Sequence, residues 1–442
     1  MGEDPLQGYR GGIRKALQDA EAGIGDLLRV ESRDGAYEGS LMPRLESADD
    51  RHLVLKMKTG YNIGVSWDKD TKIVRLGKAE KPEFRPPPLP ETKAGLPRVS
   101  IVSTGGTIAS RVDYTTGGVQ AAISSRDLLA VVPELADIAA VDADILYSVF
   151  SENVGSGHWS GMARKVEEKI GGGAEGVIIT HGTDTMGYSA AALSFALRGL
   201  PVPVIFVGSQ RSSDRPSSDA ATNLLGAVNA AIQAPFAEVV LGMHSGTSDD
   251  AIVFHRGTKV RKCHTSARYA FRSVNTDPLA RLVDGRVEVL EQGYHPRGEG
   301  PLEPMDRFEE KVSLLKFHPD FNPQFIDWLR EDGYRGIILE GTGLGHVRTE
   351  CYESIARAVR DGVYVGMTSQ CIWGRVDMNV YTTGRELIQM GVEPLDDMLP
   401  ETALVKLMWA LGNTGSTEEA RELMRRNIAG EYTERTVYEG WQ

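Results

Sequence analysis

Short runs in which apolar and polar residues alternate fill the front of the chain. They lie between residues 27 and 76 and are separated by turn signals such as Asp34-Gly35. In the run HLVLKM, Leu53 and Leu55 fall on one face, because successive side chains of a strand point to opposite faces. Period-two runs bounded by such turns are typical of β-strands. The pattern predicts a small antiparallel β-barrel domain over residues 1–80.

A proline-rich stretch follows at residues 81–97. Prolines favour extended polyproline geometry and do not support a helix. The stretch is therefore expected to be a semi-rigid linker. Its prolines are Pro82, Pro86, Pro87, Pro88, Pro90 and Pro97.

From Arg98 onward, apolar runs alternate with amphipathic segments. The runs RVSIVS, EGVIIT, PVIFVG, EVVLGM and AIVFH read as strands, and Met162, Val166 and Ile170 recur every four residues, as on one face of a helix. Such alternation is typical of parallel strands with helical crossovers. It predicts an α/β domain over residues 98–300.

A second, smaller α/β set begins at residue 301, with SLLKFHP, GIILEG and VYVGMTSQ as its strands, and is expected to end at residue 415. Residues 416–442 then form a charged tail. Ser416 and Glu419 have the spacing of a capping box, which predicts a helix near 420–428.

Charge argues against bulk attraction to nucleic acid. The 442 residues include 49 Lys+Arg and 61 Asp+Glu, for a net charge of −12. Residues 1–97 carry equal numbers of basic and acidic side chains, so the whole negative balance belongs to residues 98–442. Phosphate neutralisation requires a cationic surface, which leaves only a local basic patch open.

The cysteines and the N-terminus bear on the compartment. Cys263, Cys351 and Cys371 are too few and scattered for a disulfide framework or a zinc cage, and we expect them to be buried apolar residues of a protein in a reducing compartment. The N-terminus MGEDPLQG lacks the features of a signal peptide, and no apolar run approaches a membrane span. A cytoplasmic location is expected.

Hydroxyl side chains follow two of the predicted strands. RVSIVS runs into Thr104-Gly105-Gly106-Thr107-Ile108, and EGVIIT runs into His181-Gly182-Thr183-Asp184-Thr185. Open α/β sheets bind ligands at carboxyl strand ends, and glycines there allow a substrate to approach the backbone. A tight turn or a phosphate loop is the alternative for the first segment, and an ordinary helix N-cap is the alternative for the second.

A basic run, Arg256-Gly257-Thr258-Lys259-Val260-Arg261-Lys262-Cys263-His264, supplies a candidate base. A threonine hydroxyl is a weak nucleophile until a base takes its proton, and a lysine can do so where cationic neighbours and desolvation lower its pKa. Lys262 stands beside Arg261. A solvated basic loop or a phosphate contact is the alternative. The spacing of His244, His255 and His264 does not suit a metal site, and satisfied loop histidines are expected.

Taken together, TGGTIAS, ITHGTDTM and the stretch from Lys262 to FRSVN resemble the L-asparaginase/glutaminase family in order and spacing. The similarity covers about residues 98–412, including SQCIWGRVDMNVY and ALVKLMWAL. It implies the asparaginase-like α/β fold: a parallel sheet flanked by helices, followed by a smaller C-terminal α/β domain. It also implies an amide hydrolase with a threonine nucleophile.

The resemblance assigns roles residue by residue. Thr107 looks like the primary nucleophile and Tyr114 its hydroxyl partner, although the residues themselves do not decide whether Thr107 or Thr183 attacks. Ser151 and Glu152, in FSENVG, match the positions that hold the α-carboxylate and α-amino groups of the substrate, and many members have Gln where Glu152 stands. The remaining assignments are Thr183 as the second hydroxyl, Lys262 as its base and Asp184 as the partner of that base, with Gly106 and Gly182 as substrate-binding residues.

The additional front module resembles that of the asparaginase-like subunits of the archaeal-type glutamyl-tRNA(Gln) amidotransferases. That resemblance implies release of ammonia from glutamine or asparagine. It also implies companion E subunits, which use ATP and Mg²⁺ to convert Glu-tRNA(Gln) to Gln-tRNA(Gln). The expected assembly is a homodimer core joining two E subunits, with tRNA held mainly by the partner and with no cofactor in this chain.

Two other functions stay open. One is a free-standing cytosolic L-asparaginase with an accessory front domain. The other is an RNA-binding or assembly protein with a vestigial site, supported by the small barrel and by a cluster of basic residues. That cluster comprises Arg256, Lys259, Arg261, Arg268 and Arg272.

Overall fold

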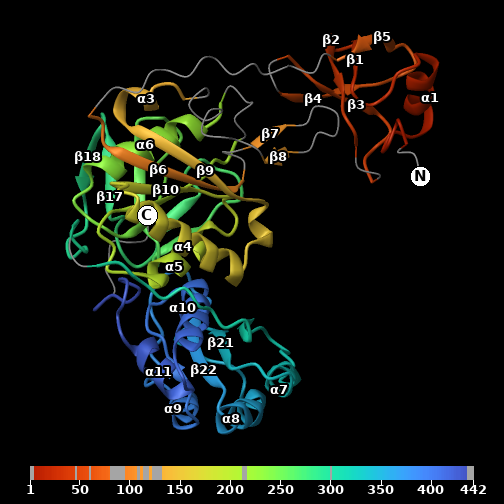
Figure 1. Cartoon of the computed structure of the whole chain (residues 1–442). Coiled ribbons are helices and arrows are strands. Elements are labelled where there is room, and N and C mark those ends of the chain that lie inside the picture. Colours follow the sequence, from red (N-terminus) through yellow and green to blue (C-terminus); the bar gives the residue numbers. More distant parts are fainter. Residues whose placement is uncertain are drawn as a thin grey trace.

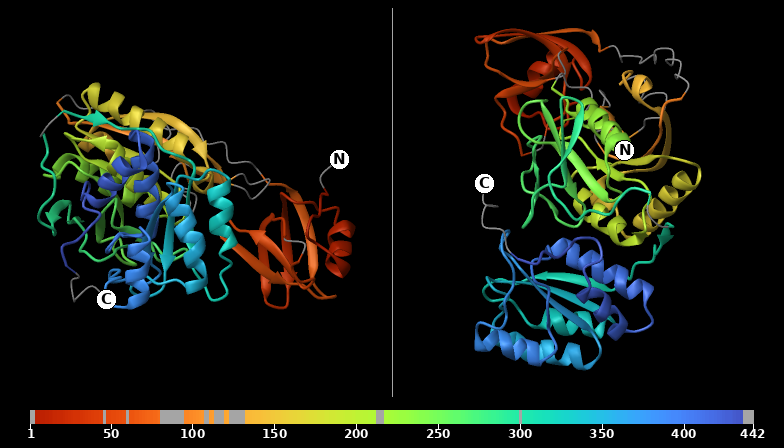
Figure 2. Two further views of the ribbon diagram at one scale, coloured as in Figure 1. Left: turned by 90° about the horizontal axis from the view of Figure 1, so that it is seen from below. Right: turned by 90° about the vertical axis from the view of Figure 1, so that its left-hand side faces the viewer.

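The structure is a computed structural model of the whole chain. It describes residues 4–44, 47–58, 61–79, 95–106, 132–211, 217–298 and 301–435, together with the backbone of 110–112 and 119–121. Two α/β domains stack on one another, and the front module projects to one side of the first (Figure 1, Figure 2).

The front module is a five-stranded antiparallel sheet with one helix. The strand order is β4-β3-β2-β1-β5. Leu28 and Val30 alternate with polar residues along β1 and pack, with Leu53 and Leu55 of β3, against Ile13 of α1. The predicted antiparallel strands are present, while α1 and β4 were not predicted. The elements are α1 (Gly11–Asp19), β1 (Asp26–Ser32), β2 (Gly35–Leu41), β3 (His52–Lys56), β4 (Asn62–Ser66) and β5 (Lys72–Lys78).

The first α/β domain is built on an eight-stranded sheet of order β18-β17-β14-β13-β12-β10-β6-β9. The strands from β9 to β13 are parallel. Its strands are β6 (Arg98–Gly105), β9 (Ala140–Val149), β10 (Gly176–Thr180), β12 (Val204–Val207), β13 (Val239–His244), β14 (Ala251–Arg256), β17 (Ala280–Val283) and β18 (Arg286–Val289).

Helices cover both faces of this sheet (Figure 1). Ile101 of β6 and Ile178 of β10 pack with α6 (Ala220–Gln233), whereas Val102 and Ile179 pack on the other face with α4 (Ser156–Gly171) and α5 (Met186–Ala196). Strands buried on both faces explain the continuous apolar runs in the sequence. Shorter elements of this domain are β7 (Ser110–Val112), β8 (Val119–Ala121), α3 (Leu135–Ile138), the 3-10 helix η2 (Ser151–Asn153), β11 (Leu197–Arg198), β15 (Val260–Lys262) and β16 (Phe271–Ser273).

One predicted strand runs in the opposite direction to the expectation. AIVFH, expected among the parallel strands, is β14 and pairs antiparallel with β13. The six residues between β13 and β14 form a short loop without a helix. A parallel pair needs a crossover of a dozen or more residues, so this connection permits only a hairpin.

The second α/β domain has a parallel sheet of order β20-β21-β22-β23. Trp409 of α10 stacks on Phe195 of α5 with ring centroids 5.7 Å apart, so one apolar cluster is continuous across both domains. The elements are β19 (Glu303–Pro304), β20 (Val312–Lys316), α7 (Gln324–Glu331), β21 (Gly336–Gly341), the 3-10 helix η3 (Thr349–Cys351), α8 (Tyr352–Arg360), β22 (Tyr364–Ser369), α9 (Thr382–Gln389), β23 (Glu393–Pro394), α10 (Pro400–Asn413) and α11 (Thr417–Arg425).

The predicted tail helix is α11, and it is shorter than expected at its C-terminal end. The Ser416 side chain accepts a hydrogen bond from the Glu419 amide at 3.2 Å, as the capping box predicts. The helix ends at Arg425, and residues 426–435 continue without a helix. Among the described residues, no helix has the length and apolar character of a membrane span.

The cysteine prediction is only partly right. Cys351 is buried, but Cys263 and Cys371 are exposed. Cys263 directly follows β15, and Cys371 lies two residues after the end of β22, where the chain leaves the packed layers.

Candidate functional site

Neighbouring parallel strands bring three of the predicted segments together. Thr180 of β10 lies opposite Ser103 of β6, and Gly105 of β6 lies opposite Val149 of β9. The segments that leave these strands therefore emerge at the same edge of the sheet, where open α/β sheets bind ligands.

Two glycines allow the segments to touch. A Cβ on Gly106, whose φ is +83°, would lie 2.5 Å from the Gly182 nitrogen. A Cβ on Gly182 would in turn lie 2.8 Å from the Ser151 Cβ. Such separations leave no room for a side chain at either glycine. The strand ends are thus packed backbone against backbone, and Ser151 lies directly beside Gly182.

Lys262 joins the threonine and the aspartate of the second segment. Its Nζ donates hydrogen bonds to Thr183 Oγ1 and to Asp184 Oδ1, each at 2.8 Å. The side chain of Lys262 is 14% exposed and that of Asp184 is 71% exposed, while Thr183 is 9% exposed. A hydroxyl, an amine and a carboxylate are therefore linked from the protein interior to the surface, which is an arrangement that can move a proton.

Lys262 is brought to this edge by a separate hairpin. β15 and β16 pair only with each other among the described strands. Arg261, expected to be a cationic neighbour of Lys262, instead pairs with Glu401 at 3.2 Å. Adjacent residues of a strand point to opposite faces, so Arg261 faces away from Lys262.

The two predicted substrate-recognition residues differ in burial. Ser151 is buried, and its carbonyl accepts a hydrogen bond from Thr185 Oγ1 at 2.6 Å. Glu152 is exposed. A buried hydroxyl and an exposed carboxylate therefore stand next to each other at the end of β9, beside Gly182.

Thr107 and Tyr114, predicted as nucleophile and hydroxyl partner, lie outside the described residues. Thr107 directly follows Gly106, which is packed against Gly182. The roles of Thr107 and Tyr114 stay predictions.

A buried network beneath the site was not predicted. His181 is fully buried, with Nδ1 2.7 Å from the Gly182 carbonyl oxygen and Nε2 2.9 Å from Ser189 Oγ. Trp159 Nε1 donates to the same Ser189 oxygen at 3.0 Å. A carbonyl only accepts, so Nδ1 carries the proton and the Ser189 hydroxyl donates to Nε2. Burial lowers the pKa of His181 to about 4, so the ring is neutral at pH 7.

That network supports the backbone of the segment that carries Thr183. The only sequence signal for it was a histidine directly before Gly182-Thr183. Its partners Trp159 and Ser189 lie on different helices, at positions set by packing.

The rings of His244 and His255 have hydrogen-bond partners, as expected, but both residues lie in strands rather than loops. His244, in β13, contacts Asn223 at 2.6 Å and Asp249 at 2.8 Å. His255, in β14, contacts Ser273 at 2.8 Å. Within the described part of the chain, no group of three His, Cys, Asp or Glu side chains is arranged to hold a metal ion.

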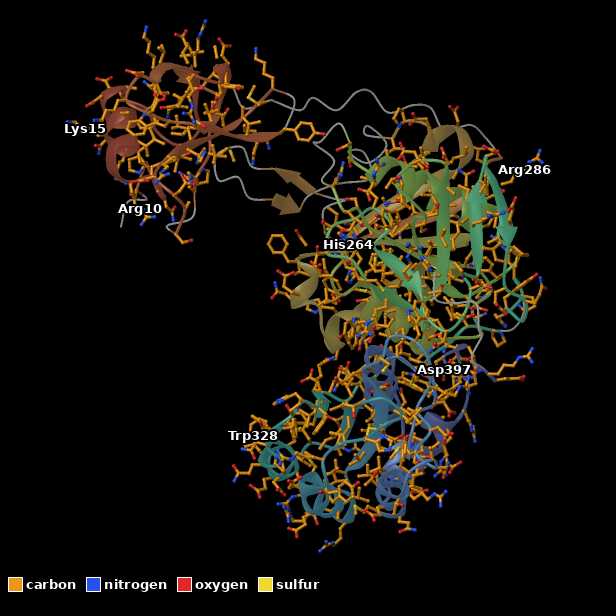
Figure 3. The ribbon with its side chains drawn as sticks, turned by 180° about the vertical axis from the view of Figure 1, so that it is seen from behind. Arg10, Lys15, His264, Arg286, Trp328 and Asp397 are labelled. Atoms are coloured by element: carbon orange, nitrogen blue, oxygen red, sulfur yellow. The ribbon has the colours of Figure 1, made fainter. Side chains whose placement is uncertain are left out.

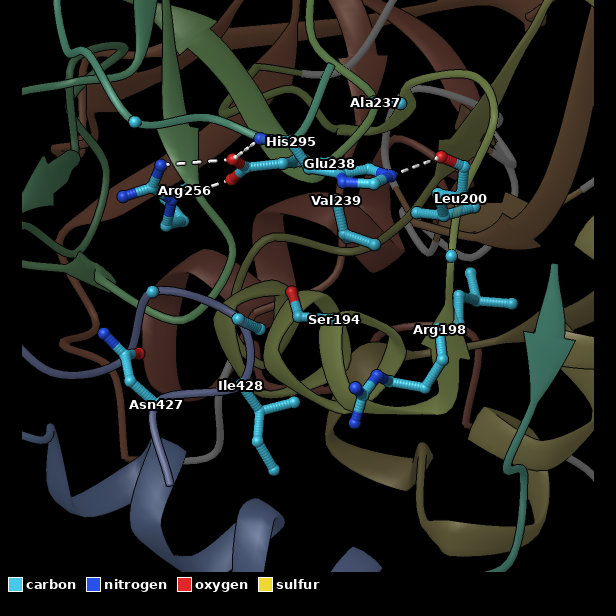
Figure 4. A pocket seen from close by; sticks show the side chains of 15 residues that line it. Ser194, Arg198, Leu200, Ala237, Glu238, Val239, Arg256, His295, Asn427 and Ile428 are labelled. Atoms are coloured by element: carbon cyan, nitrogen blue, oxygen red, sulfur yellow. Dashed lines mark hydrogen bonds and ion pairs between the residues drawn. The ribbon is translucent and has the colours of Figure 1, made fainter. Parts of the chain in front are cut away.

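A cavity of about 490 Å³ lies elsewhere, where the end of α5 and the start of β13 meet residues 427–430 (Figure 4). Arg256 and Glu238 form an ion pair at 2.7 Å on its wall, and His295 Nε2 lies 3.1 Å from the Leu200 carbonyl oxygen. It shares no lining residue with the Thr183–Lys262–Asp184 cluster.

Sequence comparisons divide the chain in the same way as its fold. Residues 98–294 match the family described as "Asparaginase, N-terminal", residues 311–424 match the "Glutaminase/Asparaginase C-terminal domain", and residues 22–76 match the "GatD N-terminal domain". Among solved structures, the thermostable L-asparaginase from Thermococcus kodakarensis is 32% identical, with a TM-score of 0.69 over 76% of this chain and 99% of its own. L-asparaginase I from Vibrio cholerae is 28% identical, with a TM-score of 0.68 and the same coverage.

Relatives that also contain the front module match nearly the whole chain. They include the D subunits of two archaeal glutamyl-tRNA(Gln) amidotransferases. The one from Methanothermobacter thermautotrophicus is 50% identical over 97% of this chain and 98% of its own length. The one from Pyrococcus abyssi is 49% identical over 97% of this chain and 99% of its own.

The fold and these relatives identify an amide-hydrolysing enzyme of the asparaginase type. The match at residues 22–76 separates it from the L-asparaginases, which align with only about three quarters of the chain. This chain therefore belongs to the GatD family, the D subunits of the glutamyl-tRNA(Gln) amidotransferases.

Proposed function

We propose that this chain releases ammonia from the side-chain amide of glutamine or asparagine for the tRNA-dependent conversion of Glu-tRNA(Gln) to Gln-tRNA(Gln). Ammonia would pass to the companion subunit, one of the E subunits of the assembly, in which ATP and Mg²⁺ act on Glu-tRNA(Gln). The observation that carries the chemistry is the pair of 2.8 Å contacts from Lys262 to Thr183 and Asp184. The full-length relatives, front module included, support the assignment to tRNA-dependent amidation.

In the proposed reaction, a threonine hydroxyl attacks the amide carbonyl. The amine of Lys262 takes the hydroxyl proton, and Asp184 stabilises the resulting ammonium ion. The tetrahedral oxyanion is held by backbone N–H groups where the glycine segments meet and where α5 begins. The lysine proton then goes to the departing nitrogen, which leaves as ammonia, and water hydrolyses the acyl-threonine.

Thr183 and Thr107 are both candidate nucleophiles in this proposal. The contact from Lys262 supports proton transfer at Thr183. The family resemblance favours Thr107 as the attacking group, with Tyr114 as its partner. Gly106, Gly182, Ser151 and Glu152 are proposed to hold the substrate, with the acid and amine of the amino acid near the end of β9.

Confinement explains why such a protein would act in a complex. Free ammonia at neutral pH is mostly ammonium, which has no lone pair for attack. A protected passage between subunits keeps it unprotonated. We therefore propose a cytoplasmic assembly with a homodimeric core of this chain and two E subunits, in which domains 1–80, 98–300 and 301–415 act as units joined by the 81–97 linker and followed by the 416–442 tail.

The experiment that tests this function compares the purified chain alone with the chain plus the companion subunit and Glu-tRNA(Gln). The proposal predicts that ammonia release from glutamine or asparagine is slow for the chain alone and rises when both partners are present. Brisk, unregulated turnover of asparagine by the chain alone would instead identify a free-standing asparaginase.

The basic cluster that supported an RNA-binding function is largely neutralised. Lys259 pairs with Asp397 at 2.7 Å with both side chains buried, and Arg268 pairs with Asp249 at 2.5 Å. Arg256 and Arg261 pair with Glu238 and Glu401. Paired guanidinium and ammonium groups release few counterions on meeting phosphate, so this cluster no longer supports RNA binding as the main role.

A further inference from the structure

The hairpin that carries Lys262 depends on contacts from outside its own sheet. Within the described residues, its two strands, β15 and β16, belong to neither the eight-stranded sheet nor the C-terminal sheet. The hairpin is held by the burial of Val260 and Phe271 in the apolar core and by polar contacts at its ends, and these contacts together set the position of Lys262 relative to Thr183.

A buried ion pair holds the end of the hairpin at which β15 begins. Lys259, directly before β15, donates to Asp397 Oδ2 at 2.7 Å, and both side chains are fully buried. Asp397 lies where the two α/β domains meet (Figure 3). Val274, directly after β16, donates its amide to the Lys259 carbonyl at 2.8 Å, so both strands are tied to the same point.

Residues 426–435 make further hydrogen bonds at the same end of the hairpin. The Thr433 amide donates to Asp397 Oδ1 at 3.0 Å, and the Thr433 hydroxyl donates to Asp397 Oδ2. The Ala429 carbonyl accepts a hydrogen bond from the Thr258 hydroxyl at 2.8 Å. The two residues that precede β15 are thus both connected to this segment.

The segment is itself fixed by a second buried ion pair. Lys406 of α10 pairs with Glu431 at 2.5 Å, and both side chains are fully buried. Glu431 also accepts the amides of Ile428 and Ala429 at 3.0 and 2.7 Å. Two buried, hydrogen-bonded charge pairs make a rigid strap, because displacing either partner would leave an unpaired charge in the interior.

We infer that residues 426–435 act as a positioning strap that sets Lys262 against Thr183 through Thr433, Asp397 and Lys259. None of these three residues contacts Thr183 or Asp184 in the described contacts, so they are positioning residues. The inference rests on the proposed role of Lys262 in amide hydrolysis. A misplacement of about 1 Å at a reacting group costs roughly 100-fold in rate, so the strap controls kcat rather than substrate affinity.

The test uses Thr433→Val, which keeps the volume of the side chain and removes the hydroxyl that donates to Asp397. The full chain with the companion subunit and Glu-tRNA(Gln) is assayed for ammonia release, well below the melting temperature of the variant. We expect kcat to fall at least fivefold with KM changed less than twofold, and Thr433→Ser to restore kcat to within twofold of the wild type.

The matched control is Thr417→Val. Thr417 is in the same C-terminal region, but its hydroxyl donates to the Gly362 carbonyl at 3.1 Å, away from the hairpin. It should leave kcat unchanged. If Thr433→Val does not fold, Arg375→Gln takes its place, because Arg375 Nη2 donates to the Thr433 carbonyl at 3.2 Å and so also holds the strap. The same fall in kcat is expected.

A folded Thr433→Val variant with wild-type kcat, or an equal loss in Thr417→Val, overturns the inference. Thr183→Ala separates this failure from that of the proposed function. If Thr183→Ala keeps wild-type ammonia release, the proposed site itself is wrong. If Thr183→Ala is inactive while the strap variants are unaffected, only the strap is wrong.

Discussion

The backbone of Gly106 lies against that of Gly182 so closely that a Cβ on Gly106 would be 2.7 Å from the Gly182 Cα. These glycines lie just beyond the ends of the neighbouring parallel strands β6 and β10, and their contact holds the two segments together at the carboxyl edge of the sheet. The site therefore depends on glycine at both positions.

Gly106→Ala is expected to lower ammonia release by roughly 100-fold, because the new methyl group must push the two strand ends apart. The positive φ at position 106 and the overlap of the new methyl group with Gly182 should also reduce the free energy of unfolding by about 1–3 kcal/mol. Gly64→Ala, in β4, is the control, since a Cβ there meets nothing within 4 Å. Steady-state kinetics and urea unfolding measure both effects. Wild-type activity in Gly106→Ala would contradict the packing described for these strand ends.

Lys262→Met is expected to lower kcat by about 100- to 10,000-fold, the range typical of losing a general acid–base group. Its effect on stability should be small, because the partner Asp184 is largely exposed and remains solvated. Lys311→Met is the control, since Lys311 forms an exposed ion pair with Asp332 in the second α/β domain. Ammonia release measured across a pH series tests this. An active Lys262→Met enzyme would show that another group takes the proton.

Acid should destabilise the protein through His181. Its folded-state pKa is about 4 against 6.5 for the ordinary group, so the unfolded chain binds one more proton between these values. The free energy of unfolding is then highest above pH 6.5 and falls as the pH drops from 6.5 to 4, by up to about 3 kcal/mol.

His181→Asn should flatten this part of the stability curve. Urea unfolding at pH 7 and pH 4.5 measures the difference, with the exposed His318→Asn as control. Burial also lowers the pKa of His255 to about 3. His255 therefore adds a similar dependence of the free energy of unfolding on pH, which persists in both variants. An unchanged slope in His181→Asn would mean that His181 is not held neutral in the folded protein.

Binding of tRNA to this chain alone should be weak and nearly independent of salt. The net charge is −12, and four of the five clustered basic residues are paired with carboxylates. Where affinity rests on phosphate contacts, the logarithm of the binding constant falls linearly with the logarithm of the salt concentration. Filter binding between about 50 and 200 mM salt measures the slope. A steep slope for the isolated chain would restore RNA binding as a principal function.

Much of the architecture could be predicted because it follows from local periodicity. The apolar runs after Arg98 correspond to strands, and Met162 and Val166 are buried on α4 as expected. The prediction that β14 runs parallel to its neighbours was wrong, because an apolar strand pattern does not indicate strand direction. The short loop between β13 and β14 is what requires the antiparallel pairing. The shorter reach of α11 reflects tertiary contacts of residues 426–435, which the capping signal at Ser416 does not report.

The placement of the candidate site residues could be predicted where they follow strand ends, and not where it depends on long-range pairing. Thr183 follows a buried strand, so its position at a sheet edge follows from the sequence. Lys259 and Lys262 look alike in a basic run, yet one is buried against Asp397 and the other reaches Thr183. Their partners are 138 and 79 residues away, and no local pattern connects them.

The most direct test is ammonia release by the Thr107→Ala, Thr183→Ala double variant, assayed as the full chain with the companion subunit and Glu-tRNA(Gln). Circular dichroism must show that the variant is folded. Release should fall to the uncatalysed background, whichever threonine attacks. Near-wild-type release by the folded double variant would show that the amide is hydrolysed by other groups.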